Sequence, residues 1–413
     1  MTLGRRDLLR LAAGIPAFAS LSNAQLPRRL PGPLPSDPAP DDEAAWERIA
    51  GEFVIDGLHL NTGTIGACPL PVIDATVQHL RAFERIIGQE AVDLAAFKRE
   101  LETFLGAWPG SVAVLRNTTE AMNNAAAGID LEPGDEVLST THEHIGGRCC
   151  WELLARRRGI AYRMFDPPLD PSGSSELIAA WQAHVTPRTR VLSISQVLFS
   201  TGMIQPVAEL VRWARSRGIV TVIDGAHPPG MLVTNLQAID ADYYATSPHK
   251  WLLAPKGTGL LIVRPDRIAT TWPLIGSGDW AAPDIRRFED VGTSNGSLVA
   301  GLRAAVAFQN AIGRDAIQRR VLALATRLYE SLAKIPSIRL RSPHHPALRS
   351  AMVSFTMDGT TAERLQAFLG AARIRTRRIA ESGYEYLRLS THIYVLPRDI
   401  DRTVALLRTA VPG

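Results

Sequence analysis

Residues 241–263, ADYYATSPHKWLLAPKGTGLLIV, contain two short apolar runs joined by a segment that carries a serine, a histidine and a lysine. The runs ADYYAT (241–246) and GTGLLIV (257–263) have the aromatic and β-branched composition of strands. A core strand would exclude Lys250, and a surface loop would be more polar than the residues that follow it. We therefore expect this lysine at the end of a buried strand, with its amine partly removed from water.

Similar strand-like runs occur along the preceding chain. They are SVAVL (111–115), DEVLST (135–140), AYRMF (161–165), RVLSIS (190–195) and VTVID (220–224). Segments with helical spacing separate them, such as TEAMNNAAAGI (119–129) and VAELVRWARSRG (207–218). Strands that alternate with helices predict an α/β fold, in which helices cover both faces of a mostly parallel sheet.

Four segments are expected from composition and pattern. Residues 1–24 resemble an export signal, and residues 25–50 form a proline-rich arm. Residues 51–295 form the large domain built on the sheet. Residues 296–413 begin with one long helical stretch and continue into a smaller C-terminal α+β domain.

The first 24 residues pair Arg5 with Arg6 ahead of a weakly apolar run that ends in small residues at Ala24. This pattern resembles a twin-arginine signal, so we expect export to the periplasm. The run is too short to span a bilayer, so no stable membrane span is expected. A frayed cytosolic N-terminus is the alternative.

Charge and cysteine content narrow the possible partners. The formal net charge is only +4 and the basic residues are scattered, so a nucleic acid is not expected as a partner. Cys68, Cys149 and Cys150 are too few for a disulfide framework, and we expect all three to be buried thiols.

Polar residues follow several of the expected strands, where ligands bind in open α/β sheets. After residue 115, Asn117 is a candidate helix cap that leaves Thr118, Thr119 and the first helix amides free for an anion such as phosphate. Asp224 ends an apolar strand and requires a cation or donor if it is buried. Thr118 and Asp224 could instead be simple helix caps, and His227 could face the same ligand or satisfy a loop carbonyl.

Lys250 completes this set of groups. Burial lowers the pKa of a lysine, and a neutral amine forms a Schiff base with an aldehyde. Ser247 and His249, beside it, are further donors for an anion. A phosphate cradle, a buried carboxylate and a reactive amine fit pyridoxal 5'-phosphate, whose phosphate, ring nitrogen and aldehyde need these three partners.

These motifs resemble those of the class V aminotransferase family of fold type I pyridoxal-phosphate enzymes. The likeness extends from HLNTGTIGACPLP at residue 59 to YLRLSTHIYV at residue 386. It is nearest to isopenicillin N epimerase-like members through DGAHPPG (224–230) and HKWLLAPKGTG (249–259). The resemblance implies the fold type I large domain and a small amino-acid-like substrate.

The resemblance also implies roles for single residues. Lys250 would form the Schiff base and move the proton, Asp224 would pair with the ring nitrogen, and His227 would approach the ring hydroxyl. His144, in THEHIGG, matches the histidine that stacks on the ring. The residues implied to hold the phosphate are Thr118, Thr119, Ser247 and His249.

Two further positions concern the substrate and the partner subunit. Arg388, in YLRLSTHIY, matches the arginine that clamps a substrate carboxylate. Thr293 matches a threonine that reaches the phosphate of the neighbouring subunit, so the resemblance implies a homodimer. Pro248 stands where relatives usually have a smaller residue, which bears on how closely Ser247 approaches the phosphate.

The sequence departs from cysteine desulfurases, which need a nucleophilic cysteine late in the chain. None follows Cys150, and Gln196 and Phe199 replace a histidine and an asparagine. His142 and His144 could bind a metal, but no third ligand is evident, so no metal is expected.

The reaction type stays open among three outcomes. We favour transamination, which needs no second base, over epimerisation at Cα and β-elimination. The alternative from another class is a non-catalytic exported binding protein that retains the fold.

Overall fold

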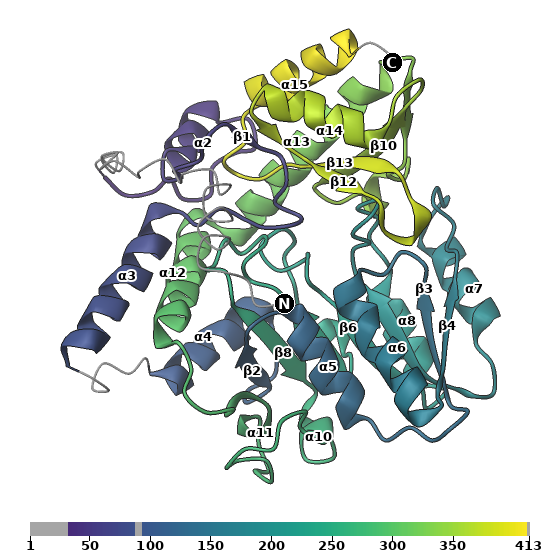
Figure 1. Ribbon diagram of the computed structural model, residues 1–413. Coiled ribbons are helices and arrows are strands. Elements are labelled where there is room, and N and C mark those ends of the chain that lie inside the picture. Colours follow the sequence, from purple (N-terminus) through teal and green to yellow (C-terminus); the bar gives the residue numbers. More distant parts are fainter. Residues whose placement is uncertain (1–31, 87–92, 411–413) are drawn as a thin grey trace, which may run out of the picture.

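The computed structural model describes residues 32–86 and 93–410 (Figure 1). The expected signal at residues 1–24 lies outside them. The main sheet has the order β2-β8-β7-β6-β5-β3-β4, and only β8 runs antiparallel to its neighbours within it. Its strands are β2 (Val112–Leu115), β3 (Glu136–Thr140), β4 (Ala161–Phe165), β5 (Thr189–Ser195), β6 (Val220–Asp224), β7 (Tyr243–Thr246) and β8 (Gly259–Val263). The predicted α/β fold and its seven strands are confirmed.

The two faces of the sheet belong to separate apolar clusters. Tyr244 of β7 packs into a cluster with Leu302, whereas Tyr243 packs into another with Trp151. Because side chains alternate along a strand, β7 is buried on both faces, which explains its continuous apolar run. The helices that contribute to these clusters are α3 (Leu70–Arg85), α4 (Leu94–Leu105), α5 (Thr118–Gly128), α6 (Ile145–Arg158), α7 (Ser174–His184), α8 (Val207–Arg215), α9 (Leu236–Ile239), α10 (Pro265–Ile268), α11 (Arg286–Glu289) and α12 (Gly296–Ile312).

A smaller unit at one end of the molecule contains an antiparallel sheet of order β12-β13-β10-β9 (Figure 1). Its strands are β9 (Ile338–Leu340), β10 (Met352–Met357), β12 (Arg377–Ile379) and β13 (Tyr386–Ser390). The helices of this unit are α13 (Arg314–Ala333), α14 (Ala362–Ala371), α15 (Pro397–Thr409) and the short turns η1 (Pro346–Leu348) and η2 (Glu381–Gly383). A parallel pair joins β1 (Leu58–His59) to β11 (Ile374–Arg375), so an early segment of the chain contacts this unit.

The expected single helical stretch after residue 296 is two helices. Gly313 separates α12 from α13 and has a φ of 103°. L-residues with a side chain rarely adopt this conformation, so the glycine ends the first helix and lets the second begin in a new direction.

The last part of the expected proline-rich arm of residues 25–50 is helical. Residues Glu43–Ala50 form helix α2, whose Trp46 is fully buried in the core of the smaller unit. Arg320 of α13 donates to both Glu43 carboxylate oxygens, at 2.5 and 2.9 Å, and lies over the Trp46 ring. The apolar spacing within α2 outweighs the proline-rich composition that precedes it.

In the described part of the chain, no helix is both long enough and apolar enough to cross a bilayer.

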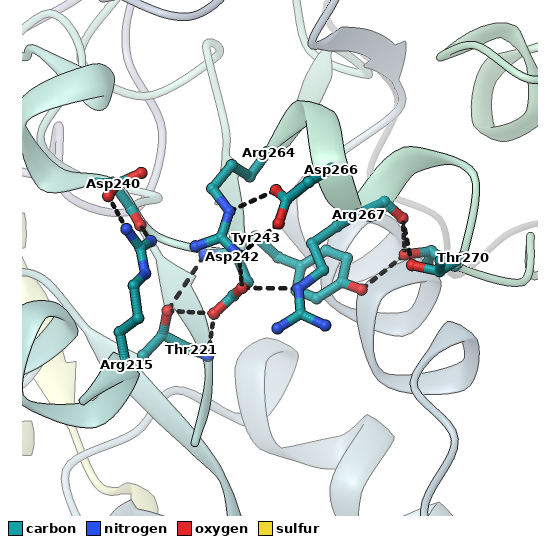
Figure 2. A network of polar contacts seen from close by, with 10 residues as sticks. Arg215, Thr221, Asp240, Asp242, Tyr243, Arg264, Asp266, Arg267 and Thr270 are labelled. Atoms are coloured by element: carbon teal, nitrogen blue, oxygen red, sulfur yellow. Dashed lines mark hydrogen bonds and ion pairs between the residues drawn. The ribbon is translucent and has the colours of Figure 1, made fainter. Parts of the chain in front are cut away.

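A buried ionic network lies at the amino ends of β6 and β7 (Figure 2). The Asp242 carboxylate accepts bonds from the Thr221 amide and hydroxyl, at 2.8 and 2.9 Å. Arg264 and Arg267 donate to its other oxygen, at 2.8 and 2.9 Å. A carboxylate as buried as that of Asp242 is stable only with such partners. The network therefore joins the amino ends of β6 and β7, at the edge of the sheet opposite their carboxyl ends.

Replacing Asp242 tests this network. We expect Asp242→Ala to lower the free energy of unfolding by about 3 kcal/mol, because it leaves the buried Thr221 amide without its acceptor. It also removes the only carboxylate that pairs with Arg267 in the described residues, whereas Arg264 keeps Asp266. Denaturant unfolding of both proteins measures the loss. Asp401→Ala, which removes the exposed Asp401–Arg327 pair, is the matched control and should change stability by less than about 1 kcal/mol. Equal losses in the two variants would contradict the role of the network.

Candidate active site

The carboxyl ends of the parallel strands and the smaller unit enclose a cavity of about 240 Å³. It is lined by Gly63, Thr64, Asn117, Thr118, Thr119, His144, Gly146, Ser195, Val197, Phe199, Asp224, Ala226, His227, Ser247, His249, Lys250, Arg377 and Arg388. All of the predicted site residues except Thr293 are in this set. They come together because β2, β3, β5, β6 and β7 end at the same edge of the sheet.

Lys250 follows β7 in a tight turn, where its amide donates to the Ser247 carbonyl at 3.0 Å. The Gly66 amide donates to the His249 carbonyl at 2.9 Å, and a Cβ at position 66 would lie 1.9 Å from the Lys250 carbonyl oxygen. Only glycine therefore permits this close approach. Burial lowers the pKa of the Lys250 amine to about 8; the nearby Asp224 opposes this shift and Arg388 adds to it. A usable fraction of the amine is thus neutral near pH 7.

Asp224 ends β6 and is 6% exposed. One of its carboxylate oxygens accepts from the Ala226 amide at 2.9 Å. Burial raises the pKa of Asp224, and the charge of Lys250 together with the amide bond opposes this shift. A Cβ at Gly147 would lie 2.7 Å from the other oxygen, so α6 can pass this closely only through a glycine. The carboxylate therefore faces a narrow space that suits a protonated ring nitrogen.

Two of the three histidines that line the cavity, His144 and His227, have defined neutral tautomers. The Trp251 indole N–H donates to His227 Nδ1 at 3.0 Å, so the neutral imidazole carries its proton on Nε2. The Gly146 amide likewise donates to His144 Nδ1 at 3.1 Å, where His144 caps α6. Burial lowers the pKa of both rings, that of His144 to about 4. Each neutral ring therefore has one N–H available to a ligand.

The expected anion cradle forms at the start of α5. Asn117 caps the helix by accepting from the Glu120 amide at 2.9 Å. Ser247 Oγ lies 3.1 Å from the Thr118 amide and 2.7 Å from the Thr118 hydroxyl, so Pro248 does not keep Ser247 away. Thr119 is exposed at the same cavity wall. Hydroxyl and amide donors at a helix N-terminus are a favourable set for a phosphate.

Arg388 is 2% exposed and lies on β13 of the smaller unit. Its guanidinium donates to the Phe199 carbonyl at 2.5 Å and to the Thr64 hydroxyl at 3.1 Å. Its Nε has no partner, and no carboxylate pairs with it in residues 32–86 and 93–410. Burial and then the neighbouring Arg377 lower the pKa of Arg388 to about 9. A buried cation with only neutral partners favours an anionic ligand.

Thr293, the three cysteines and His142 do not line this cavity. Thr293 is exposed, and its contact with the phosphate of a partner subunit stays a prediction. Only Cys150 is fully buried; Cys68 and Cys149 are partly exposed, so the expectation of three buried thiols is wrong for these two. His142 bonds to Ser200 at 2.6 Å and stacks on Tyr384. Across the described residues, no three potential metal ligands gather.

Sequence reasoning missed Arg377, Thr64 and Ser195 as members of the cavity wall. Arg377 is the register partner of Arg388 on the neighbouring strand β12, within a run of arginines that has no motif of its own. Thr64 belongs to the quoted HLNTGTIGACPLP segment, but only its contact with Arg388 shows its role. Pairing across strands and between distant segments is not visible in local sequence.

Together the fold and the cavity define a pyridoxal-phosphate-dependent enzyme of fold type I. A family model described as aminotransferase class-V matches residues 75–402, and the chain belongs to this family, whose cofactor is pyridoxal 5'-phosphate. The cavity fits that group, because the phosphate cradle, the Asp224 carboxylate and the Lys250 side chain line one and the same cavity.

Two curated relatives match almost the whole chain. The isopenicillin N epimerase of Streptomyces clavuligerus is 35% identical over 388 residues, which cover 87% of this chain and 96% of the relative. That of Amycolatopsis lactamdurans is 32% identical over 392 residues, covering 88% and 98%. Among solved structures, a C-DES variant with glycine covalently linked to its pyridoxal-phosphate cofactor shares the fold, with a TM-score of 0.77, 24% identity and coverage of 86% of this chain and 97% of that chain.

Replacing Lys250 tests its assignment as the residue that carries the cofactor. We expect Lys250→Ala to lower turnover at least about a thousand-fold, because no amine remains to bind the aldehyde or to take a proton. Borohydride treatment followed by peptide mass spectrometry should give a cofactor adduct at residue 250 of the unmodified protein and none in the variant. Lys256→Ala, which removes a nearby exposed lysine, is the control and should retain the adduct. An unmodified Lys250 would contradict the assignment.

His249 predicts a pH-dependent cofactor affinity. Its Nδ1 lies 3.0 Å from the Thr258 carbonyl and must donate to it, so the neutral ring presents only a lone pair at Nε2. Burial lowers the pKa of this ring, and a phosphate anion favours its protonated form. Binding therefore takes up a proton, and affinity should fall as pH rises.

This affinity is measured most clearly in a Lys250→Ala background, where binding is not covalent. Titration with pyridoxal phosphate across pH should show a shallower loss of affinity for His249→Gln, whose amide donates at every pH. Identical pH slopes with and without His249 would show that the ring does not contact the phosphate.

Proposed function

We propose that this protein epimerises the Cα of an amino-acid-like substrate, with pyridoxal phosphate as its cofactor. The full-length similarity to two isopenicillin N epimerases carries the choice of reaction. The cavity supports it, because it combines an amine of lowered pKa with a buried guanidinium suited to a carboxylate.

Each of three cavity residues has a separate role in the proposed reaction. Arg388 binds the substrate carboxylate, and Thr64 and the Phe199 carbonyl hold its guanidinium in place. The neutral Lys250 amine takes the Cα proton. Asp224 holds a positive charge at the ring nitrogen, so the bound cofactor supplies an electron sink for the broken C–H bond. Delivery of a proton from solvent water to the opposite face of Cα, and loss of the first proton from Lys250 to solvent, complete the epimerisation.

Transamination, which the sequence favours because it needs no second base, is the second candidate. The family description supports it, and Lys250 alone would move the proton from Cα to the cofactor. Sulfur removal in the manner of a cysteine desulfurase is disfavoured, since the chain has no cysteine after Cys150. A non-catalytic binding protein is disfavoured, because it would need neither the lowered pKa of Lys250 nor the unpaired Arg388.

We further propose that the protein is exported to the periplasm and acts as a homodimer. The paired arginines ahead of a weakly apolar run support export. The exposure of Thr293 outside its own cavity is compatible with a contact to the partner's phosphate site.

Isotope exchange distinguishes these reactions. In deuterated water, a panel of L-amino acids should acquire deuterium at Cα and accumulate the D-isomer without added keto acid. Keto acid formed with an amino acceptor would instead establish transamination, and ammonia or sulfide release would establish elimination. Arg388→Lys, which keeps the charge but loses the bidentate grip, should raise KM at least about tenfold for substrates with a carboxylate. The absence of Cα exchange with every amino acid would contradict the proposal.

A further inference from the structure

The cavity wall conceals a second carboxyl group that none of the steps above uses. Glu143 lies between the end of β3 and the His144 cap of α6, and its side chain is 2% exposed. Its oxygens contact the Thr140 hydroxyl at 2.9 Å, the Ser195 hydroxyl at 2.5 Å and the Ser195 amide at 3.4 Å. No cation pairs with it in the described residues.

Glu143 lies close to the cofactor-binding carboxylate. Ser195, which contacts Glu143, lines the cavity and is the register partner of Asp224 on the neighbouring strand. Glu143 and Asp224 are therefore two buried carboxyl groups close to Ser195. A negative charge on one disfavours a negative charge on the other. Lys250 and the cofactor ring give Asp224 a positive partner, whereas Glu143 has only hydroxyl and amide partners.

Burial, and to a smaller extent the charge of Asp224, raises the pKa of Glu143 to about 7; its bonds to Ser195 and Thr140 oppose the shift. The other titratable groups that face these two carboxyl groups include the phenols of Tyr162 on β4 and Tyr244 on β7, the Cys150 thiol of α6 and the Lys250 amine. Burial raises the pKa of both phenols and of the thiol, so they are neutral near pH 7. The Lys250 amine, with a pKa of about 8, also titrates near neutrality, but it would be in a Schiff base with the cofactor in the holoenzyme. This leaves Glu143 as a carboxyl group that changes charge near pH 7.

We propose that Glu143 is a positioning residue for the cofactor ring: a buried carboxyl group, hydrogen-bonded to Ser195, whose protonated form keeps a second negative charge away from Asp224. When Glu143 loses this proton, its charge strengthens proton binding at Asp224 and at the groups that Asp224 and Lys250 contact. The protonation of Glu143 therefore adjusts the electron sink without Glu143 touching the cofactor. This inference rests on the cofactor and holds for either reaction at Cα.

The test measures the visible absorbance of the holoenzyme against pH. Glu143→Gln keeps the shape of the side chain and removes its charge, so the midpoint of the absorbance change should move to lower pH by about half a unit or more. Ser195→Ala removes a bond that favours ionised Glu143 and should move the midpoint in the same direction. Glu136→Gln, another buried carboxyl group at the opposite end of β3, is the matched control and should leave the midpoint unchanged.

Stability gives a second readout that does not depend on turnover. The folded protein holds a proton on Glu143 that the unfolded chain releases at lower pH, so stability is lost as pH rises from about 5 to about 8. The melting temperature of the wild-type holoenzyme should fall relative to Glu143→Gln across this range. A glutamate whose pKa is the same in the folded and unfolded states would give a difference that is constant with pH, so this readout tests the protonation of Glu143 and the absorbance midpoint tests its effect on the cofactor.

The absorbance experiment distinguishes a failure of the Glu143 proposal from a failure of the cofactor assignment. Identical absorbance midpoints in the wild type and in yellow, folded Glu143→Gln would overturn the proposal and leave the cofactor in place. A colourless wild-type protein would overturn the cofactor assignment and this proposal together.

Discussion

The site depends on the electrostatic balance between Lys250 and Asp224 in a space largely shielded from water. Burial disfavours the charge on each group, and each charge partly compensates the other. The balance leaves the amine with a pKa of about 8, so it is partly neutral, and keeps a carboxylate where a ring nitrogen would be held. Most other features of the molecule place or surround these two side chains.

Backbone packing around the pair explains several glycines. Gly66 lets an early segment of the chain approach the turn at Lys250, and Gly147 lets α6 pass beside Asp224. The network around Asp242 secures the opposite ends of β6 and β7, the strands that carry Asp224 and precede Lys250. The rigid sheet thus fixes the relative positions of an amine and a carboxylate separated by 25 intervening residues.

The smaller unit adds what the main sheet lacks, a group for the substrate carboxylate. Arg388 reaches the cavity from β13, and its partners come from two separate parts of the chain, with Thr64 before the main sheet and Phe199 after β5. Glu143 adds a second buried ionisable carboxyl group close to the cavity. The cavity is therefore an assembly of neighbouring charges, and a change in one alters the proton affinity of the others.

The sequence by itself determined the α/β fold, the seven strands and most of the cavity residues, because strand periodicity and the residues that follow strand ends are local signals. It also indicated the cofactor through the combined motifs around Asp224 and Lys250. Only the tertiary structure decided the break at Gly313, the packing of α2, the role of Thr64 beside Arg388 and the partners of Glu143. These depend on contacts between segments distant along the chain, and local composition does not encode which segments meet.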